Sequence, residues 1–279
     1  MAEDSKKYTA FRSPSGTLFE FQVIPMGLKI SSMVWQRLVD RILRGAHTYA
    51  SALIDDIVVH SMDWTSHMAH ITEVLERLRK AGLTANTSKC QFALRRIRCL
   101  GHVLENGLIK MDDSKVEAIK NLKVPQTKRQ CKSILGLMGY YRSHIRDFGA
   151  RAYPLTELLH KSKPDRIQWG EKEQAAFDDL KACLLAKPCL WPPDHQQGYV
   201  IQSDASQFGV GATLLQRING EERVIAYASR KLLPREQLYS TIERELLAVT
   251  FSLQKFEQYV YGREIRLETD HKPLLYLKT

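Results

Sequence analysis

Short apolar runs alternate with helical hydrophobic periodicity in the first third of the chain, which predicts an α+β unit. Residues 18–24 alternate apolar and polar side chains and stop at Pro25, as a strand does. One helix is predicted from Ser31 to Leu43, and a second opens at Thr65 and ends before Gly82. The side chains expected in the core are Met33, Val34, Leu38, Ile42 and Leu43 of the first helix and Met68, Ile71, Val74, Leu75 and Leu78 of the second.

Two adjacent carboxylates interrupt an apolar stretch between these helices. Asp55 and Asp56 separate the runs 52–54 and 57–59, which predicts two strands with the acidic pair at the tip of a hairpin. Two negative charges beside apolar strands are costly unless a cation compensates them, so a divalent metal is one interpretation. A tight turn with solvated acids is the alternative, and the pair alone does not decide between them.

The rest of the chain predicts a helical segment followed by a small mixed sheet. Residues 113–194 are helical and basic, and Pro192-Pro193-Asp194 marks a domain boundary. Beyond it, strands are expected at 199–204, 209–215, 224–227 and 265–270, with a helix through 242–256 and an Asn-Gly hairpin turn at Asn219. We therefore expect three domains, at 1–110, 111–195 and 196–279.

Composition narrows the class of partner. The 279 residues carry 41 Lys and Arg against 31 Asp and Glu, a net charge of +10 that favours a polyanion such as nucleic acid. The five cysteines show no Cys-x-x-Cys spacing, so neither a disulfide framework nor a zinc knuckle is indicated. No apolar run is long enough to span a bilayer and the first seven residues lack a signal-peptide core, which predicts an intracellular protein, cytoplasmic or nuclear, and no membrane partner.

Three further carboxylates stand at the ends or edges of apolar elements. Asp204 ends the first strand after the boundary, Glu245 lies beside the apolar stripe of the helix, and Asp270 ends the last predicted strand. A small mixed sheet can bring such positions together around two divalent cations, the arrangement that phosphodiester hydrolysis uses. Taken singly, each is equally explained as a surface acid. His67 and His70 have helical spacing, but no third ligand candidate stands near them, and a solvated helix start explains them better.

Collinear motifs along nearly the whole chain resemble the reverse transcriptase and ribonuclease H of a gypsy-type LTR retrotransposon Pol polyprotein. Residues 52–59 resemble the Tyr-x-Asp-Asp hairpin of the polymerase palm. The segments that resemble the remaining motifs are Thr9-Ala10-Phe11, Pro25-Met26-Gly27-Leu28-Lys29 through Gln36, Lys89-Cys90-Gln91-Phe92, Leu100-Gly101-His102-Val103, Tyr140-Tyr141-Arg142, Ser203-Asp204-Ala205-Ser206, Glu243-Arg244-Glu245-Leu246 and Thr269-Asp270-His271-Lys272-Pro273-Leu274.

The resemblance implies a fold and roles for particular residues. It implies a partial right-hand polymerase palm, a helical thumb or connection, and a ribonuclease H-like sheet with its helix. Asp55 and Asp56 would be polymerase carboxylates, with Asp55 the firmer metal ligand, and the nuclease ligands would be Asp204, Glu245 and Asp270. All-carboxylate sites favour Mg²⁺ or Mn²⁺. The implied partners are an RNA–DNA hybrid or primer-template, contacted by Gly27, Gln36, Lys89, Gly101, Lys128 and Arg142, and a deoxynucleoside triphosphate for an intact polymerase.

Departures from the family pattern predict reduced activity. The family's first polymerase carboxylate and its fingers precede the segment that Met1 to Asp4 resembles, so we expect the chain to lack them and its polymerase to be disabled. Leu53 stands where the family has Tyr or Phe, and Ile30 and Ser32 stand where it usually has Asn and Pro. Thr279 precedes the family's last nuclease strands, final helix and fourth acidic or His position, so RNA cleavage is expected to be weak.

Two other hypotheses remain open at this stage. The first alternative to a retroelement-derived enzyme is a non-catalytic nucleic-acid-binding protein of the same origin, which would bind a duplex without Mg²⁺ and with steep salt dependence. A decayed element without function is the second, and it predicts a chain that does not unfold cooperatively.

Overall fold

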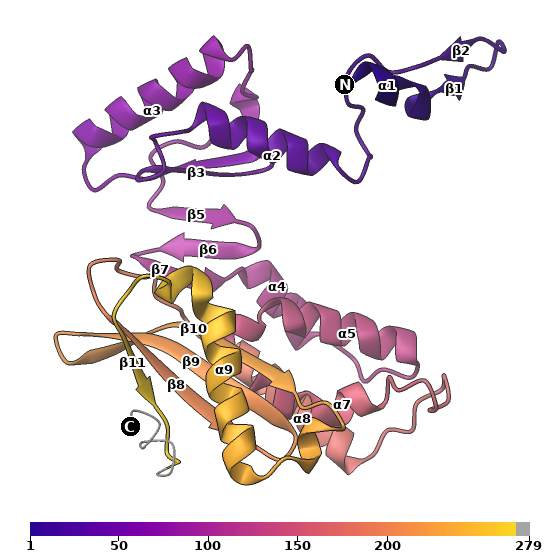
Figure 1. Ribbon diagram of the computed structural model, residues 1–279, viewed down its shortest axis with the longest axis vertical. Helices are drawn as coiled ribbons and strands as arrows, with labels where there is room; N and C mark the ends of the chain where they lie inside the picture. Colours follow the sequence, from indigo (N-terminus) through magenta and orange to yellow (C-terminus); the bar gives the residue numbers. More distant parts are fainter. Residues whose placement is uncertain (272–279) are drawn as a thin grey trace. The chain divides into compact units, whose positions relative to one another are not determined.

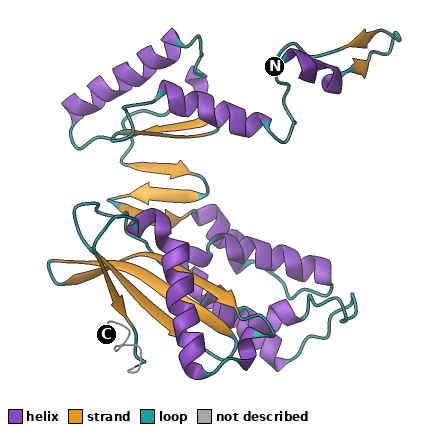
Figure 2. Ribbon diagram, in the orientation of Figure 1, coloured by secondary structure: helices purple, strands orange, loops and turns teal. Residues whose placement is uncertain are grey.

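A computed structural model describes residues 1–271 of the chain, which form two compact units, Met1–Phe92 and a second that begins at Ala93 (Figures 1 and 2). Both combine helices and strands, which confirms the α+β class. The expected limits at residues 110 and 195 fall inside the second unit, and the division into family domains stays a prediction.

The first unit packs two helices against a short hairpin. Its core is formed by Val39, Leu43, Ala46, Ala50, Val74 and Leu78. The elements are α1 (Glu3–Lys6), η1 (Lys7–Thr9), β1 (Phe11–Arg12), β2 (Leu18–Phe19), α2 (Ser31–Ile42), β3 (Ala50–Leu53), β4 (Asp56–Val59), α3 (Trp64–Lys80) and η2 (Thr87–Lys89). Both predicted helices are present, and Asp63 caps α3 by accepting a hydrogen bond from the Ser66 N–H at 2.9 Å.

Two expectations for this unit are wrong. The strand predicted at 18–24 is confined to Leu18–Phe19, which pair with β1. Met33, Val34 and Leu38 are exposed because α2 turns Trp35 and Val39 toward the core in their place. Ile42 and Leu43, which were also expected there, do contribute to the core. For α3 the predicted core face is also only partly correct: Val74 and Leu78 are buried, whereas Met68 and Leu75 are exposed.

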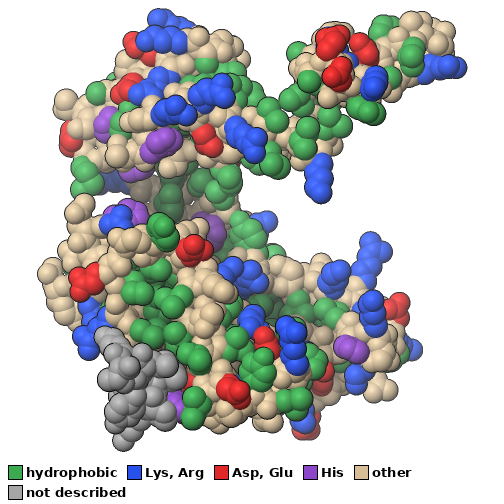
Figure 3. Space-filling model, in the orientation of Figure 1, with side chains coloured by type: hydrophobic (Ala, Val, Ile, Leu, Met, Phe, Trp, Pro, Cys, Tyr) green, Lys and Arg blue, Asp and Glu red, His purple; other side chains and the backbone are tan. Residues whose placement is uncertain are grey.

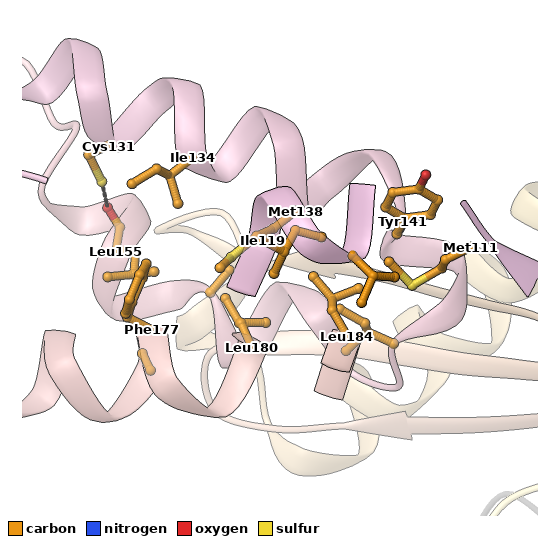
Figure 4. Close-up of a cluster of buried hydrophobic side chains, with 14 of the residues drawn as sticks. Met111, Ile119, Cys131, Ile134, Met138, Tyr141, Leu155, Phe177, Leu180 and Leu184 are labelled. Atoms are coloured by element: carbon orange, nitrogen blue, oxygen red, sulfur yellow. Dashed lines mark hydrogen bonds between the residues drawn. The ribbon is translucent and has the colours of Figure 1, made fainter. Parts of the chain in front are cut away.

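The second unit begins with a three-stranded antiparallel sheet and five helices. The strands are β5 (Arg96–Cys99), β6 (His102–Glu105) and β7 (Leu108–Met111), and the helices are α4 (Asp113–Lys120), α5 (Lys128–Tyr140), α6 (Phe148–Arg151), α7 (Tyr153–Glu157) and α8 (Glu171–Leu185), with η3 (Arg142–His144) between α5 and α6. Thr127 and Gln130 form a capping box at the start of α5. Figure 4 shows the core between these helices, where Ile119, Met138, Leu180 and Leu184 are fully buried.

A four-stranded mixed sheet in the order β10-β9-β8-β11 completes the second unit. Its elements are β8 (Tyr199–Ala205), β9 (Gly209–Ile218), β10 (Glu221–Lys231), η4 (Glu236–Leu238), α9 (Thr241–Val260) and β11 (Ile265–Glu268). Asn219 and Gly220 both have positive φ, 54° and 83°, so the predicted Asn-Gly turn between β9 and β10 is confirmed. Helix α9 packs on β8 and β9 and buries Phe256 and Val260 against Tyr199, Ile201 and Leu214.

The segment around Pro192 is built into the second unit. Leu190 pairs with Ile109 of β7, and the Trp191 N–H donates to the Val224 carbonyl of β10 at 2.8 Å. The side chain of Gln216 then holds the backbone N–H and carbonyl of Asp194. The Pro-Pro segment therefore joins the two sheets of this unit.

Candidate active site

Strand β8, helix α9 and the end of β11 bring three carboxylates together. Strand β11 runs parallel to β8 with Glu268 opposite Gln202, and Asp270 follows two residues after the end of β11. Glu245 lies in the first turns of α9, whose start is fixed by a capping box between Ser240 and Glu243. One carboxylate oxygen from each of Asp204, Glu245 and Asp270 lies within 4.8 Å of the others, so these three side chains converge as predicted.

Glu245 makes this cluster a candidate cation site. The residue is 5% exposed and its Oε2 has no hydrogen-bond partner. Burial raises the pKa of Glu245, and the charges of Asp204 and Asp270 raise it further, while a hydrogen bond from the Ala205 backbone acts in the opposite direction. A buried carboxylate beside two others is unfavourable in the absence of a compensating charge. The oxygen donors and their spacing suit Mg²⁺ or Mn²⁺.

A fourth carboxylate, which the sequence did not single out, comes from the helical segment. Asp147 precedes α6 with a left-handed φ of 55°, a conformation that Asp and Asn adopt more readily than other side chains. Its Oδ1 occupies the space where a Cβ on Gly211 would lie, and Gly211 is the cross-strand partner of Asp204. Burial raises the pKa of Asp147, and the charge of Asp204 contributes in the same direction.

Asp55 and Asp56 lie at the predicted hairpin tip, but as a pair without a third ligand. Strands β3 and β4 pair from Ala50 opposite Val59 to Leu53 opposite Asp56, and both aspartates are exposed. Within residues 1–271, no His, Cys, Asp or Glu joins them to form a group of three. The hairpin tip thus presents two adjacent, exposed carboxylates.

Two side chains of α2 hold this hairpin in place. Gln36 accepts a hydrogen bond from the Ile54 N–H at 2.6 Å and donates to the Ala52 carbonyl at 3.0 Å, while Trp35 Nε1 donates to the Ile54 carbonyl at 2.9 Å. Ile54 has a φ of 52°, which costs a β-branched residue about 1–2 kcal/mol. Backbone strain of this kind concentrates at functional sites, where surrounding contacts maintain it. Gln36, expected to contact nucleic acid, has its amide engaged with the hairpin.

The other residues expected to contact nucleic acid are divided between the two units. Gly27 in the first unit has a φ of 90° with open space around it, and Lys89 ends η2. In the second unit Gly101 lies in the β5–β6 turn with a φ of 68°, where a Cβ would come 3.1 Å from the Tyr140 ring. Lys128 donates to the carbonyls of His160 and Lys163 at 2.8 and 2.5 Å, so it also serves the protein's own backbone, and Arg142 is exposed at the start of η3.

A basic surface accompanies the helices of the second unit. Lys and Arg side chains are visible over α4 and α5 in Figure 3, and the exposed ones there are Lys115, Lys120, Arg129 and Lys132. Their charges are consistent with a polyanionic partner. No helix in the described part of the chain is long and apolar enough to cross a membrane.

Comparisons with known proteins agree with this description. The family model described as reverse transcriptase (RNA-dependent DNA polymerase) matches residues 1–104, and the model described as the RNase H-like domain found in reverse transcriptase matches residues 169–267. The retrovirus-related Pol polyproteins from transposons opus and gypsy of Drosophila melanogaster are 37% and 35% identical over 99% of the chain. The chain spans 28% and 27% of the lengths of these two polyproteins.

Solved structures support the fold. A foamy viral protease-reverse transcriptase in complex with double-stranded DNA superposes with a TM-score of 0.84 at 22% identity, covering 100% of this chain and 49% of that one. The same viral protein in complex with an RNA/DNA hybrid gives 0.86 at 21% identity, covering 97% of this chain and 36% of the viral chain. At this identity the likeness concerns the fold.

Proposed function

We propose that the Asp204–Glu245–Asp270 centre of this chain hydrolyses the RNA strand of RNA–DNA hybrids. The chain belongs to the reverse transcriptase family and matches part of gypsy-type retrotransposon Pol polyproteins, including an RNase H-like domain. The single observation that carries this proposal is the buried, unpartnered Oε2 of Glu245 beside two exposed aspartates, all within 4.8 Å. Asp204, Glu245 and Asp270 would hold divalent cations, which would supply the chemistry for hydrolysing a phosphodiester.

The carboxylates have distinct tasks in this proposal. Asp204 and Asp270 are exposed, so they face the nucleic acid, and buried Glu245 fixes the position of the pair from the helix side. Mg²⁺ or Mn²⁺, when bound, would activate a water and stabilise the leaving oxygen. The raised pKa of Glu245 means that the site carries less than its full negative charge in mildly acidic solution, where binding of a cation competes with a proton.

The partner proposed is an RNA–DNA hybrid or a primer-template. The net charge of +10 would attract the phosphate backbone of a nucleic acid. The foamy viral structures of similar fold contain double-stranded DNA or an RNA/DNA hybrid. For polymerisation, we propose that Asp55 and Asp56 are metal ligands. Among residues 1–271 no third His, Cys, Asp or Glu joins them, so we expect deoxynucleoside triphosphate incorporation by this chain alone to be disabled or very weak.

A non-catalytic nucleic-acid-binding role is the second candidate. The basic side chains over α4 and α5 favour it, because they would hold a duplex in the absence of any metal. It predicts binding without cleavage, and binding that weakens steeply as salt rises.

The test is cleavage of a hybrid whose RNA strand is end-labelled, with Mg²⁺ or Mn²⁺ and with EDTA. The wild-type chain should cut the RNA strand only with metal, and Asp204→Asn should abolish cutting while Asp178→Asn, a substitution on α8, should retain it. Binding without cutting by a folded wild-type chain would reject the nuclease and leave the binding role.

A further inference from the structure

Arg244 lies beside the carboxylate centre, and its guanidinium nitrogens make few and long hydrogen bonds. It precedes Glu245 on α9, and its two terminal nitrogens reach the Ser206 carbonyl at 3.4 Å and the Thr241 hydroxyl at 3.5 Å. Both distances are at the long limit for a hydrogen bond. The Nε atom is buried without a partner, and no carboxylate pairs with Arg244 among the residues that the structure describes.

Two arginines of the sheet on which α9 packs are each paired with carboxylates. Arg217 donates to Glu222 and Glu268 at 2.6–3.0 Å, and Arg230 donates to Glu236 at 2.6 and 3.1 Å. A partly buried guanidinium without such a partner is unfavourable unless an anion arrives from outside. Arg244 differs from these two arginines because it has no carboxylate partner among the described residues and its terminal nitrogens make only two long hydrogen bonds, which an external anion could replace.

The location of Arg244 restricts the chemistry of that ligand. Its contact with the Ser206 carbonyl places the guanidinium over the turn that follows Asp204 and Ala205, and the Ala205 backbone is hydrogen-bonded to Glu245. A free carboxylate or a small anion would be repelled by the three acids nearby. A phosphate that belongs to a longer chain is held there by its neighbours, and a guanidinium binds phosphate through two parallel N–H bonds.

We propose that Arg244 binds a backbone phosphate of the nucleic acid next to the phosphodiester at the Asp204–Glu245–Asp270 centre. The inference rests on the proposed function for its choice of substrate. Arg244 would set the register of the strand, because a fork of donors fixes both the position and the orientation of a phosphate. It is a positioning residue and does not touch the bond that breaks.

The test is binding of a fluorescently labelled RNA–DNA hybrid to the full chain in EDTA, measured by anisotropy over a series of KCl concentrations. Arg244→Gln should weaken binding about tenfold and lower the slope of log K against log salt by about 0.9, the value for one phosphate contact. Arg244→Lys should retain the slope and recover part of the affinity, since it keeps the charge and loses the fork. Arg235→Gln, which removes an exposed arginine, is the matched control.

The possible outcomes separate this inference from the nuclease. If Arg244→Gln and Arg235→Gln behave alike, or if the chain does not bind the hybrid, the inference is overturned. If Arg244→Gln weakens binding but the wild-type chain cuts no RNA with metal, Arg244 binds phosphate and the nuclease proposal fails. If the chain does cut, Arg244→Gln should raise KM more than it lowers kcat.

Discussion

Replacing Glu245 by glutamine should stabilise the metal-free second unit. The substitution keeps the shape of the side chain and removes a buried charge that lies within 4.8 Å of two other carboxylates. At that separation, each repulsive pair costs about 0.9 kcal/mol in a water-like medium and about 3.5 kcal/mol at an effective dielectric constant of about 20. Because Asp204 and Asp270 are exposed, the lower figure is closer, and the two pairs together cost about 2 kcal/mol.

The sign of the pH dependence follows from the raised pKa of Glu245. Below the ordinary glutamate pKa the group is protonated in both folded and unfolded chains and costs nothing. As the pH rises above the ordinary pKa, Glu245 ionises in the unfolded chain but not yet in the folded one, so the folded state loses stability until the pH passes the raised folded pKa. The stabilisation by Glu245→Gln should therefore be absent in acid and complete at neutral pH.

Calorimetry in EDTA and in Mg²⁺ checks this prediction. In EDTA at neutral pH, Glu245→Gln should raise the Tm of the second unit by about 4–8 °C. Mg²⁺ should raise the Tm of the wild type and leave the variant unchanged, because a ligand stabilises only a state that binds it. Glu257→Gln, an exposed position on the same helix, is the control. A variant that melts below the wild type in EDTA, or that responds to Mg²⁺ equally, would refute the reasoning.

Three further substitutions test other parts of the structure. His144 is 3% exposed, and burial lowers its pKa to about 4. Because the unfolded chain takes up this proton at a higher pH, the free energy of unfolding of the wild type should fall by about 2 kcal/mol between neutral pH and about pH 5. Urea unfolding of His144→Phe should not show this fall. An equal loss in both proteins would contradict it. Gln36→Met should cost about 1–2 kcal/mol and speed hydrogen exchange at the Ile54 amide, which loses its acceptor; unchanged exchange there would count against the hairpin clamp. Gly211→Ala should destabilise the chain by about 1–3 kcal/mol, because the new Cβ would overlap the Asp147 side chain. Adding Asp147→Gly should restore part of this stability, whereas additive effects in the double variant would show that the two residues do not interact.

The residues of the carboxylate centre could be predicted from the sequence because each belongs to a strand or helix with a clear hydrophobic pattern. Asp204 follows a β-branched run and Glu245 lies beside a regular helical stripe, so both elements were predicted close to their true bounds. Their convergence depends on β11 pairing in parallel with β8, a contact between residues more than sixty positions apart. Local pattern does not specify such a pairing; it indicated only that a small mixed sheet can bring the ends of these elements together.

Interactions that depend on tertiary packing were missed or misread. The exposed positions of Met33 and Leu38 show that a helix containing apolar residues on several faces does not reveal which face meets the core. The hydrogen bonds of the Gln36 amide to the β3–β4 turn depend on the packing of α2 on the hairpin, which the sequence does not reveal, and the expected contact of Gln36 with nucleic acid stays a prediction. Asp147 gave no signal because its approach to Gly211 joins a helix start to a distant strand.

The most direct test of the central claim is Mn²⁺ binding measured by electron paramagnetic resonance of the free ion. The wild-type chain should bind Mn²⁺ in competition with Mg²⁺, and the double variant Asp204→Asn/Asp270→Asn should lose the Mg²⁺-competed binding that Asp178→Asn retains. Equal binding by the wild type and the double variant would contradict a metal centre formed by Asp204, Glu245 and Asp270.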